Sequence, residues 1–131
     1  MVEDFARWRH FVIAKLSENH DMRIVGAVSD GLEAVLKAAE MQPDLILLDV
    51  GLPKLNGIEA AQRICKVAPK SKILFLSQEI DAEVARVALT YGHGYVLKSD
   101  AGNELFVAIE VVMQGEKFVS LRLAADFFAR V

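Results

Sequence analysis

The sequence predicts one α/β domain, a doubly wound sandwich with helices on both faces of a parallel sheet. Four short runs are almost wholly apolar, at residues 23–28, 45–48, 73–76 and 94–97. Continuous rather than alternating apolar runs are typical of strands covered on both faces. Segments of helical periodicity separate these runs, and alternating strands and helices imply right-handed crossovers in a parallel sheet.

Size and composition agree with one compact core. The chain has 131 residues, of which 53% are hydrophobic and 25% charged, and its single cysteine excludes an internal disulfide framework. A net charge of -3 gives no sign of the basic surface that binds nucleic acid. No apolar run approaches the roughly 20 residues of a membrane-spanning helix. The N-terminus does not resemble a signal peptide. We therefore expect a cytoplasmic protein that by itself binds neither nucleic acid nor membrane.

Several segments carry apolar residues at helical spacing, which form a stripe along one face of each expected helix. The first helix is expected over residues 5–16, and a last one begins near Ser120, with Leu123 and Phe127 apolar. The stripes expected to cover the sheet are Phe5, Trp8, Val12 and Leu16; Leu32, Val35, Leu36 and Ala39; Ile58, Ala61, Cys65 and Ala68; and Leu105, Ala108, Ile109 and Val112. On its stripe, Cys65 is interpreted as a small core residue.

Capping residues mark where two of these helices begin and end. Asp30 and Asn56 can each accept a hydrogen bond from the first free amides of the helix that follows. Pro43 and Pro69 lie where the preceding helices must already have ended. No repeat or low-complexity linker divides the chain, so the sequence predicts a single domain.

Polar residues directly follow three of the apolar runs, namely Asp49, Ser77 and Lys98. Ligands of open α/β sheets bind beyond the carboxyl ends of the strands, so these side chains are expected to converge. Each one alone is more often a loop cap. The acidic pair Glu3 and Asp4 has two equally weighted interpretations: it favours the positive end of the first helix, or it joins Asp49 in binding a hard cation such as Mg2+.

Residues 44–57, DLILLDVGLPKLNG, resemble the phosphoacceptor segment of two-component receiver domains. The similarity continues through Glu3, Asp4, Ser77, Tyr95 and Lys98 and covers nearly the whole chain. It implies a flavodoxin-like fold with strand order 2-1-3-4-5.

The resemblance also implies roles for individual residues. Asp49 would accept a phosphoryl group from a sensor histidine kinase or phosphotransfer protein, and Ser77 and Lys98 would contact that group. Mg2+ would be held by Glu3, Asp4, Asp49 and the backbone carbonyl of Gly51. Tyr95 would turn from exposed to buried as Ser77 moves inward. From strand position alone, Tyr95 would instead be a half-buried aromatic residue.

The chain departs from the family pattern in two places. Ser99 and Asp100 follow Lys98, a form similar to the branch with a C-terminal helix-turn-helix output domain, which suggests transcription regulation. We expect a receiver at residues 1–119 and a C-terminal helix at 120–131. Only Met1 and Val2 precede the acidic pair, so the first strand is largely missing. An upstream start or another segment is expected to fill its place, and without one metal binding and phosphorylation should be weak.

Two other functions remain open at this point. One is a binding module that no longer depends on phosphorylation; the other, ranked far below, is a hydrolase with Asp49 as nucleophile, disfavoured because Gly51 stands where such enzymes carry a second acid. The chain is expected to catalyse no reaction beyond its own phosphorylation and dephosphorylation. A homodimer is a candidate assembly, but Leu105, Phe106, Ile109 and Met113 are interpreted as core rather than as its interface. Neither Trp8 nor any histidine is expected to have a functional role.

Overall fold

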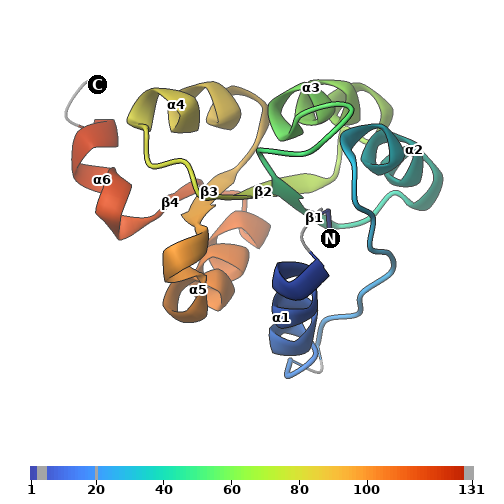
Figure 1. The fold of residues 1–131 in the computed structure, drawn as a ribbon, viewed down its shortest axis with the longest axis horizontal. Helices are drawn as coiled ribbons and strands as arrows, with labels where there is room; N and C mark the ends of the chain where they lie inside the picture. Colours follow the sequence, from blue (N-terminus) through green and yellow to red (C-terminus); the bar gives the residue numbers. More distant parts are fainter. Residues whose placement is uncertain (3–5, 20, 129–131) are drawn as a thin grey trace.

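Four parallel strands form the centre of the fold in the computed structural model, which describes residues 1–2, 6–19 and 21–128 (Figure 1). The strands are β1 (Leu45–Asp49), β2 (Lys72–Ser77), β3 (Gly94–Leu97) and β4 (Phe118–Val119), and they lie in the order β1-β2-β3-β4. The first three are the predicted runs. β4 was not predicted, because two residues are too short for a hydrophobic pattern, and it is recognised by its pairing with Gly94 and Tyr95.

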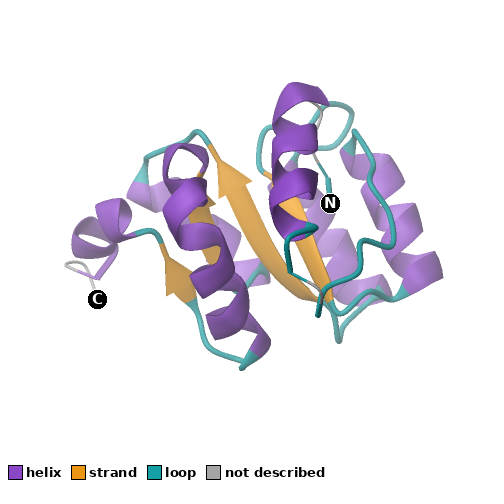
Figure 2. Cartoon of the chain, turned by 90° about the horizontal axis from the view of Figure 1, so that it is seen from below, coloured by secondary structure: helices purple, strands orange, loops and turns teal. Residues whose placement is uncertain are grey.

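Helices cover both faces of the sheet, which confirms the doubly wound α/β class (Figure 2). They are α1 (Ala6–Leu16), α2 (Gly31–Met41), α3 (Gly57–Val67), α4 (Ala82–Tyr91), α5 (Ala101–Met113) and α6 (Leu121–Phe128), with a short 3-10 turn η1 (Lys98–Asp100). One buried cluster lies between the sheet and α2, α3 and α4, and a second between the sheet and α1 and α5. No helix in the described ranges is long and apolar enough to cross a bilayer.

The predicted caps of α2 and α3 are confirmed. The Asp30 carboxylate accepts a hydrogen bond from the Glu33 amide at 2.9 Å, and the Asn56 side chain accepts one from the Glu59 amide at 2.9 Å. Each satisfies an amide that has no partner within its own helix. Both helices also end before Pro43 and Pro69, as expected.

Small residues form the buried face of α2, and of the predicted stripe on this helix only Val35 packs against the core, half-buried. Gly31, Ala34 and Ala38 face the core, whereas Leu32 and Leu36 are 43% and 70% exposed. Both sets have helical spacing, and periodicity alone favoured the larger side chains. The close approach of α2 to the loop after β1 selects the small ones, because a Cβ on Gly31 would lie 1.9 Å from the Leu55 carbonyl oxygen.

Cys65 is the second correction on this face of the sheet. It is exposed rather than core, and its thiol lies 3.2 Å from the carbonyl oxygen of Tyr91, its hydrogen-bond acceptor. The buried residues of α3 are Gly57, Ala60, Ala61 and Ile64, one position away from the predicted stripe along most of the helix. Of the predicted stripe, Ala61 and Ala68 are buried, and Ile58 is half-buried and packs against the core.

The opposite layer follows the predicted stripes more closely. Val12 and Leu16 of α1 and all four predicted residues of α5 are buried. Of the apolar residues weighed for an interface, Phe106 is half-buried and packs on the core, and Met113 is 43% exposed. The interpretation as core therefore holds for most of this strip.

Residues 23–28 do not form the predicted strand; only Val28 makes an isolated bridge, and its partner is Val2. Val2 also bridges Leu48, donating to the Leu47 carbonyl at 2.7 Å and accepting from the Asp49 amide at 3.1 Å. Residues 28, 2 and 48 thus lie side by side in the expected 2-1-3 order, but Val2 joins Val28 and Leu48 through isolated bridges only. Residues 22–27, before Val28, form no strand or helix.

Candidate functional site

Asp49 is the last residue of β1 and is 6% exposed. One carboxylate oxygen accepts a hydrogen bond from the Gly51 amide at 3.3 Å. Its own backbone amide bonds the carbonyl oxygen of Val2, so the N-terminal bridge holds the residue in place. Asp49 is therefore a nearly buried carboxylate at the carboxyl end of the sheet, where the sequence predicted it.

The loop after Asp49 is held against the backbone at a position that only glycine can occupy. A Cβ on Gly57 would lie 2.1 Å from the Asp49 carbonyl oxygen, so any larger residue would push the two segments apart. The Gly57 amide donates to the Val50 carbonyl at 2.8 Å, and the Val50 amide donates to Leu76 of the next strand at 3.3 Å. These contacts fix the direction in which the Asp49 side chain leaves β1.

Lys98 follows β3 directly and reaches the carboxylate of Asp49. Its ammonium lies 3.4 Å from Asp49 Oδ2, and each side chain of the pair is 8% exposed. The two opposite charges attract each other in a place where little water screens them. The predicted convergence of Asp49 and Lys98 is therefore present in the fold.

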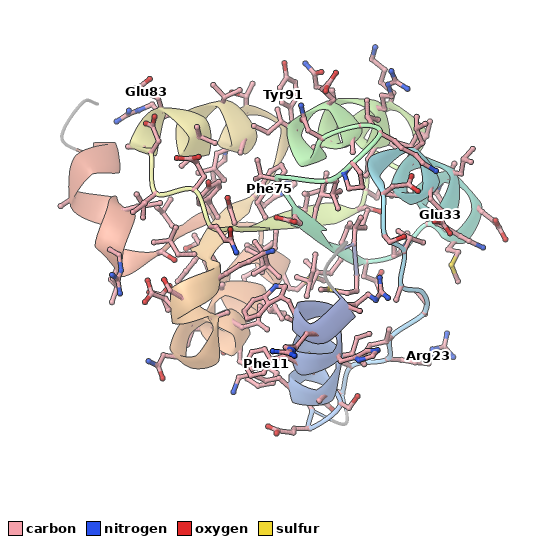
Figure 3. All side chains as sticks on the ribbon, in the orientation of Figure 1. Phe11, Arg23, Glu33, Phe75, Glu83 and Tyr91 are labelled. Carbon is pink, nitrogen blue, oxygen red and sulfur yellow. The ribbon has the colours of Figure 1, made fainter. Side chains whose placement is uncertain are left out.

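Ser77 and Tyr95 form a second half of the site. Ser77 is 3% exposed, and its hydroxyl oxygen accepts a hydrogen bond from the Glu79 amide at 2.9 Å. The Tyr95 hydroxyl donates to the Glu79 carbonyl at 2.8 Å. Tyr95 is fully buried, so the expectation of a half-buried residue based on strand position is wrong. Its ring lies 6.5 Å from that of Phe75 in the middle of the sheet (Figure 3).

Burial raises the pKa of Tyr95 to about 12, with Glu79 and Asp49 adding to the effect and a hydrogen bond with Ser77 opposing it. The phenol is thus protonated at neutral pH and serves as a donor. Side chains alternate between the two faces of a strand. Tyr95 shares the cluster on the α2, α3 and α4 side, whereas the Lys98 ammonium lies against Trp8 of α1 on the other side.

The donors predicted for Mg2+ are only partly within the described residues. Asp49 and the Gly51 backbone are present and adjacent, and carboxylate and carbonyl oxygens are the ligands that Mg2+ prefers. Glu3 and Asp4 lie outside the described residues. Across the part of the chain that the structure describes, no three His, Cys, Asp or Glu side chains gather into a further metal site.

Sequence reasoning missed a polar network behind the site, centred on Ser120. This residue is fully buried; its hydroxyl accepts from the Leu97 amide at 2.9 Å and donates to the Glu104 carboxylate at 2.5 Å. Its amide donates to the Tyr95 carbonyl at 3.0 Å. Arg122 then pairs with Asp100 through two contacts of 3.0 and 3.2 Å. The C-terminal helix is thereby tied to the strand and turn that carry Tyr95 and Lys98.

Comparison with known proteins identifies relatives of this chain. A family model described as the response regulator receiver domain matches residues 1–110. The oxygen regulatory protein NreC of Staphylococcus epidermidis is 36% identical over 113 residues, which are 85% of this chain and 52% of that protein. The transcriptional regulatory protein LiaR of Bacillus subtilis is 30% identical over 132 residues, covering 100% of this chain and 63% of LiaR. The chain thus spans about half to two thirds of the length of these relatives.

Solved structures show the same fold. A LuxR-family two-component response regulator from Aurantimonas sp. superposes with a TM-score of 0.87 at 29% identity, covering 98% of this chain and 93% of the other. The response regulator domain of Thermotoga maritima CheB gives a TM-score of 0.76 at 32% identity, over 86% of this chain and 92% of the other.

Proposed function

This chain belongs to the response regulator receiver domains, and we propose that it accepts a phosphoryl group on Asp49 and passes the signal on through the surface around Tyr95. Receiver domains are signalling modules rather than enzymes with an external substrate. The observation that carries the proposal is the nearly buried pair of Asp49 and Lys98, 3.4 Å apart at the carboxyl end of the sheet.

In the proposed reaction, a carboxylate oxygen of Asp49 attacks the phosphorus atom of a phosphohistidine. A new P–O bond forms as the P–N bond breaks, and the imidazole nitrogen keeps the electron pair of that bond and takes up a proton. Lys98 offsets the negative charge on the phosphoryl oxygens, since its ammonium already lies beside the acceptor. Response regulators receive their phosphoryl groups from histidine kinases, and a kinase or a phosphotransfer protein is the donor proposed for this chain.

Receiver domains generally bind Mg2+ at the phosphorylation site. Asp49 and the Gly51 carbonyl would hold the ion together with Glu3 and Asp4, and it would neutralise charge that opposes the meeting of two anions. All four groups offer oxygen, the ligand atom that Mg2+ prefers.

Two neighbouring hydroxyls support a switch in this chain. Ser77 can donate a hydrogen bond to a phosphoryl group on Asp49, and moving it inward would break its bond with the Glu79 amide. Tyr95 is bound to the carbonyl of the same residue. A change at Ser77 is therefore passed to Tyr95 through Glu79, and the surface of α4 and β3 changes with it.

A binding module independent of phosphorylation is the second candidate. The buried Tyr95 hydroxyl already donates a hydrogen bond to the Glu79 carbonyl. The surface around Tyr95 can therefore keep this one arrangement without phosphorylation.

NreC and LiaR are named as regulatory proteins, and we propose transcription regulation as the output of this chain. It would take place in the cytoplasm, through a further domain or partner rather than through nucleic-acid binding by these residues. We also propose a receiver at 1–119 with the helix at 120–131 as its connection, and a homodimer as a candidate assembly.

The test is to incubate the chain with Mg2+ and the small phosphodonor phosphoramidate, and to follow the intact mass. Wild type should gain one phosphoryl group and Asp49→Asn none. Asp44→Asn is the matched control, because Asp44 is an exposed carboxylate just before the other end of the same strand and should leave labelling unchanged. An unlabelled wild type would reject phosphotransfer in favour of the binding module, whereas labelling of Asp49→Asn would move the acceptor elsewhere.

A further inference from the structure

Trp8, in the first turn of α1, lies against the charged lysine of the site. The Lys98 ammonium is 5.6 Å from the centre of the indole ring, within the range of a cation-π contact. Lys98 is 8% exposed, so the ammonium has lost most of its water and the attraction is stronger than on an open surface. A residue of the first helix thus contacts the group that follows the third strand.

The Lys98 ammonium lies near two groups, the Asp49 carboxylate and the indole ring of Trp8. A charge-assisted hydrogen bond between ammonium and carboxylate is typically about 2.7–2.9 Å long, whereas this pair is 3.4 Å apart. The lysine stem therefore holds its charge between the carboxylate and the indole face. Removing either contact would let the ammonium shift toward the other or toward water.

Contacts of its aromatic ring hold Trp8 in place. Its ring stacks on Phe11, one turn later, with centroids 5.1 Å apart and an interplanar angle of 23°; Figure 3 shows Phe11 on the side of α1 toward α5. Among the described residues its indole N–H is buried with no hydrogen-bond partner. No hydrogen bond in the described structure therefore orients the ring, and packing and the cation set its position.

A groove runs beside this contact. It is lined by Arg7, Trp8, Phe11, Gln78, Lys98 and Ser99. The Lys98 stem forms one wall, so a smaller side chain at position 8 would open a path for water to the ammonium. Lys98 would then gain freedom to leave the carboxylate and extend into the groove.

We propose that Trp8 is a positioning residue, whose indole face holds the Lys98 ammonium beside Asp49 in readiness for the incoming phosphoryl oxygens. The inference rests on the proposed function, in which Lys98 contacts those oxygens. An aliphatic side chain would fill the same space but lacks the negative ring face that attracts a cation. The role thus belongs to the ring and not to apolar volume alone.

The first measurement compares initial rates of Asp49 phosphorylation by phosphoramidate with Mg2+. Trp8→Leu should react about 5- to 30-fold more slowly, and Trp8→Phe, which keeps an aromatic face, within about threefold of wild type. Phe11→Leu is the matched comparison: it removes one support of the Trp8 ring but leaves the ring over Lys98, so its loss of rate should be smaller than that of Trp8→Leu. Circular dichroism must show all three variants folded.

The second measurement uses fluorescence, because Trp8 is the sole tryptophan of the chain. Lys98→Met removes the ammonium from the indole face and should change the emission of Trp8. Wild type should respond to beryllofluoride with Mg2+, a phosphoryl mimic that draws the ammonium toward Asp49, and Lys98→Met should not.

A normal rate in Trp8→Leu, or an equal loss in Phe11→Leu, would overturn the assignment, since either result reduces Trp8 to packing. If wild type itself takes no phosphoryl group, the proposed function fails separately. The emission of Lys98→Met then still decides the matter: a change supports the contact, and an unchanged spectrum refutes it. A variant that does not fold is replaced in the comparison by Trp8→Met, which keeps much of the volume without a ring.

Discussion

Replacing Ser120 by alanine tests the network that ties the C-terminal helix to the switch strand. The change removes an acceptor from the Leu97 amide and a donor to the Glu104 carboxylate, in a place where both Ser120 and Leu97 are almost fully buried. A buried amide left without a partner costs about 1–3 kcal/mol. A hydrogen bond to a charged group contributes about 1.5–3 kcal/mol.

The two effects do not add fully, because Glu104 keeps its bond from the Leu121 amide and is only half-buried. We therefore expect Ser120→Ala to lower the free energy of unfolding by about 3 kcal/mol, a large part of the roughly 5–15 kcal/mol of an ordinary domain. The loss should appear in urea denaturation followed by circular dichroism, and as a fall of roughly 10 °C in the melting temperature. Amides of α6 should exchange hydrogen faster.

Ser17→Ala provides the matched control. The Ser17 hydroxyl donates to the Ile13 carbonyl at 2.8 Å on an exposed stretch of chain. Its removal should change stability by less than about 0.5 kcal/mol. If Ser120→Ala were equally mild, the hydroxyl would not be satisfying the Leu97 amide, and the account of how α6 is attached to β3 would be wrong.

Two further substitutions test the loop at Asp49 and the opposite end of the sheet. Gly57→Ala should lower the free energy of unfolding by about 1–3 kcal/mol and slow phosphorylation, because its Cβ would meet the Asp49 carbonyl. Gly102→Ala in α5 is the control; its Cβ would meet nothing, so it should be neutral or stabilising. Equal changes of the two variants in urea denaturation would contradict this explanation. Burial and two nearby lysines lower the pKa of His93 below 6.5, and its Nδ1 accepts from the Ile73 amide. The folded state therefore binds fewer protons than the unfolded state, and stability should fall as pH drops below about 6.5, less so in His93→Gln; a pKa at or above 6.5 by NMR would refute it.

The sequence predicted the part of the site that depends on strand ends. Asp49, Ser77 and Lys98 each follow an apolar run, and the carboxyl ends of neighbouring parallel strands meet, so their convergence needed no knowledge of side-chain positions. The helix caps Asp30 and Asn56 were equally local and could be identified from nearest neighbours.

The features that were missed depend on how closely elements approach each other. Either of two stripes on α2 could have faced the core, and only the contact between Gly31 and Leu55 decides between them. Ser120 was expected as the start of a helix, but its burial against Leu97 requires the pairing of β4, which is too short to be recognised in the sequence. Trp8 has an ordinary core spacing, and its contact with Lys98 joins residues 90 positions apart in the chain.

The attachment of the N-terminal residues through Val2 also affects how the domain opens. The four named strands and their connecting helices form one continuous unit, whereas Val2 joins it through an isolated bridge to Leu48. Segments held by few backbone hydrogen bonds open locally at a lower free energy than the global transition. The bridge between Val2 and Leu48 can therefore open while the four-stranded sheet persists, and Asp49 would lose its backbone bond to Val2 while Lys98 remained beside its strand.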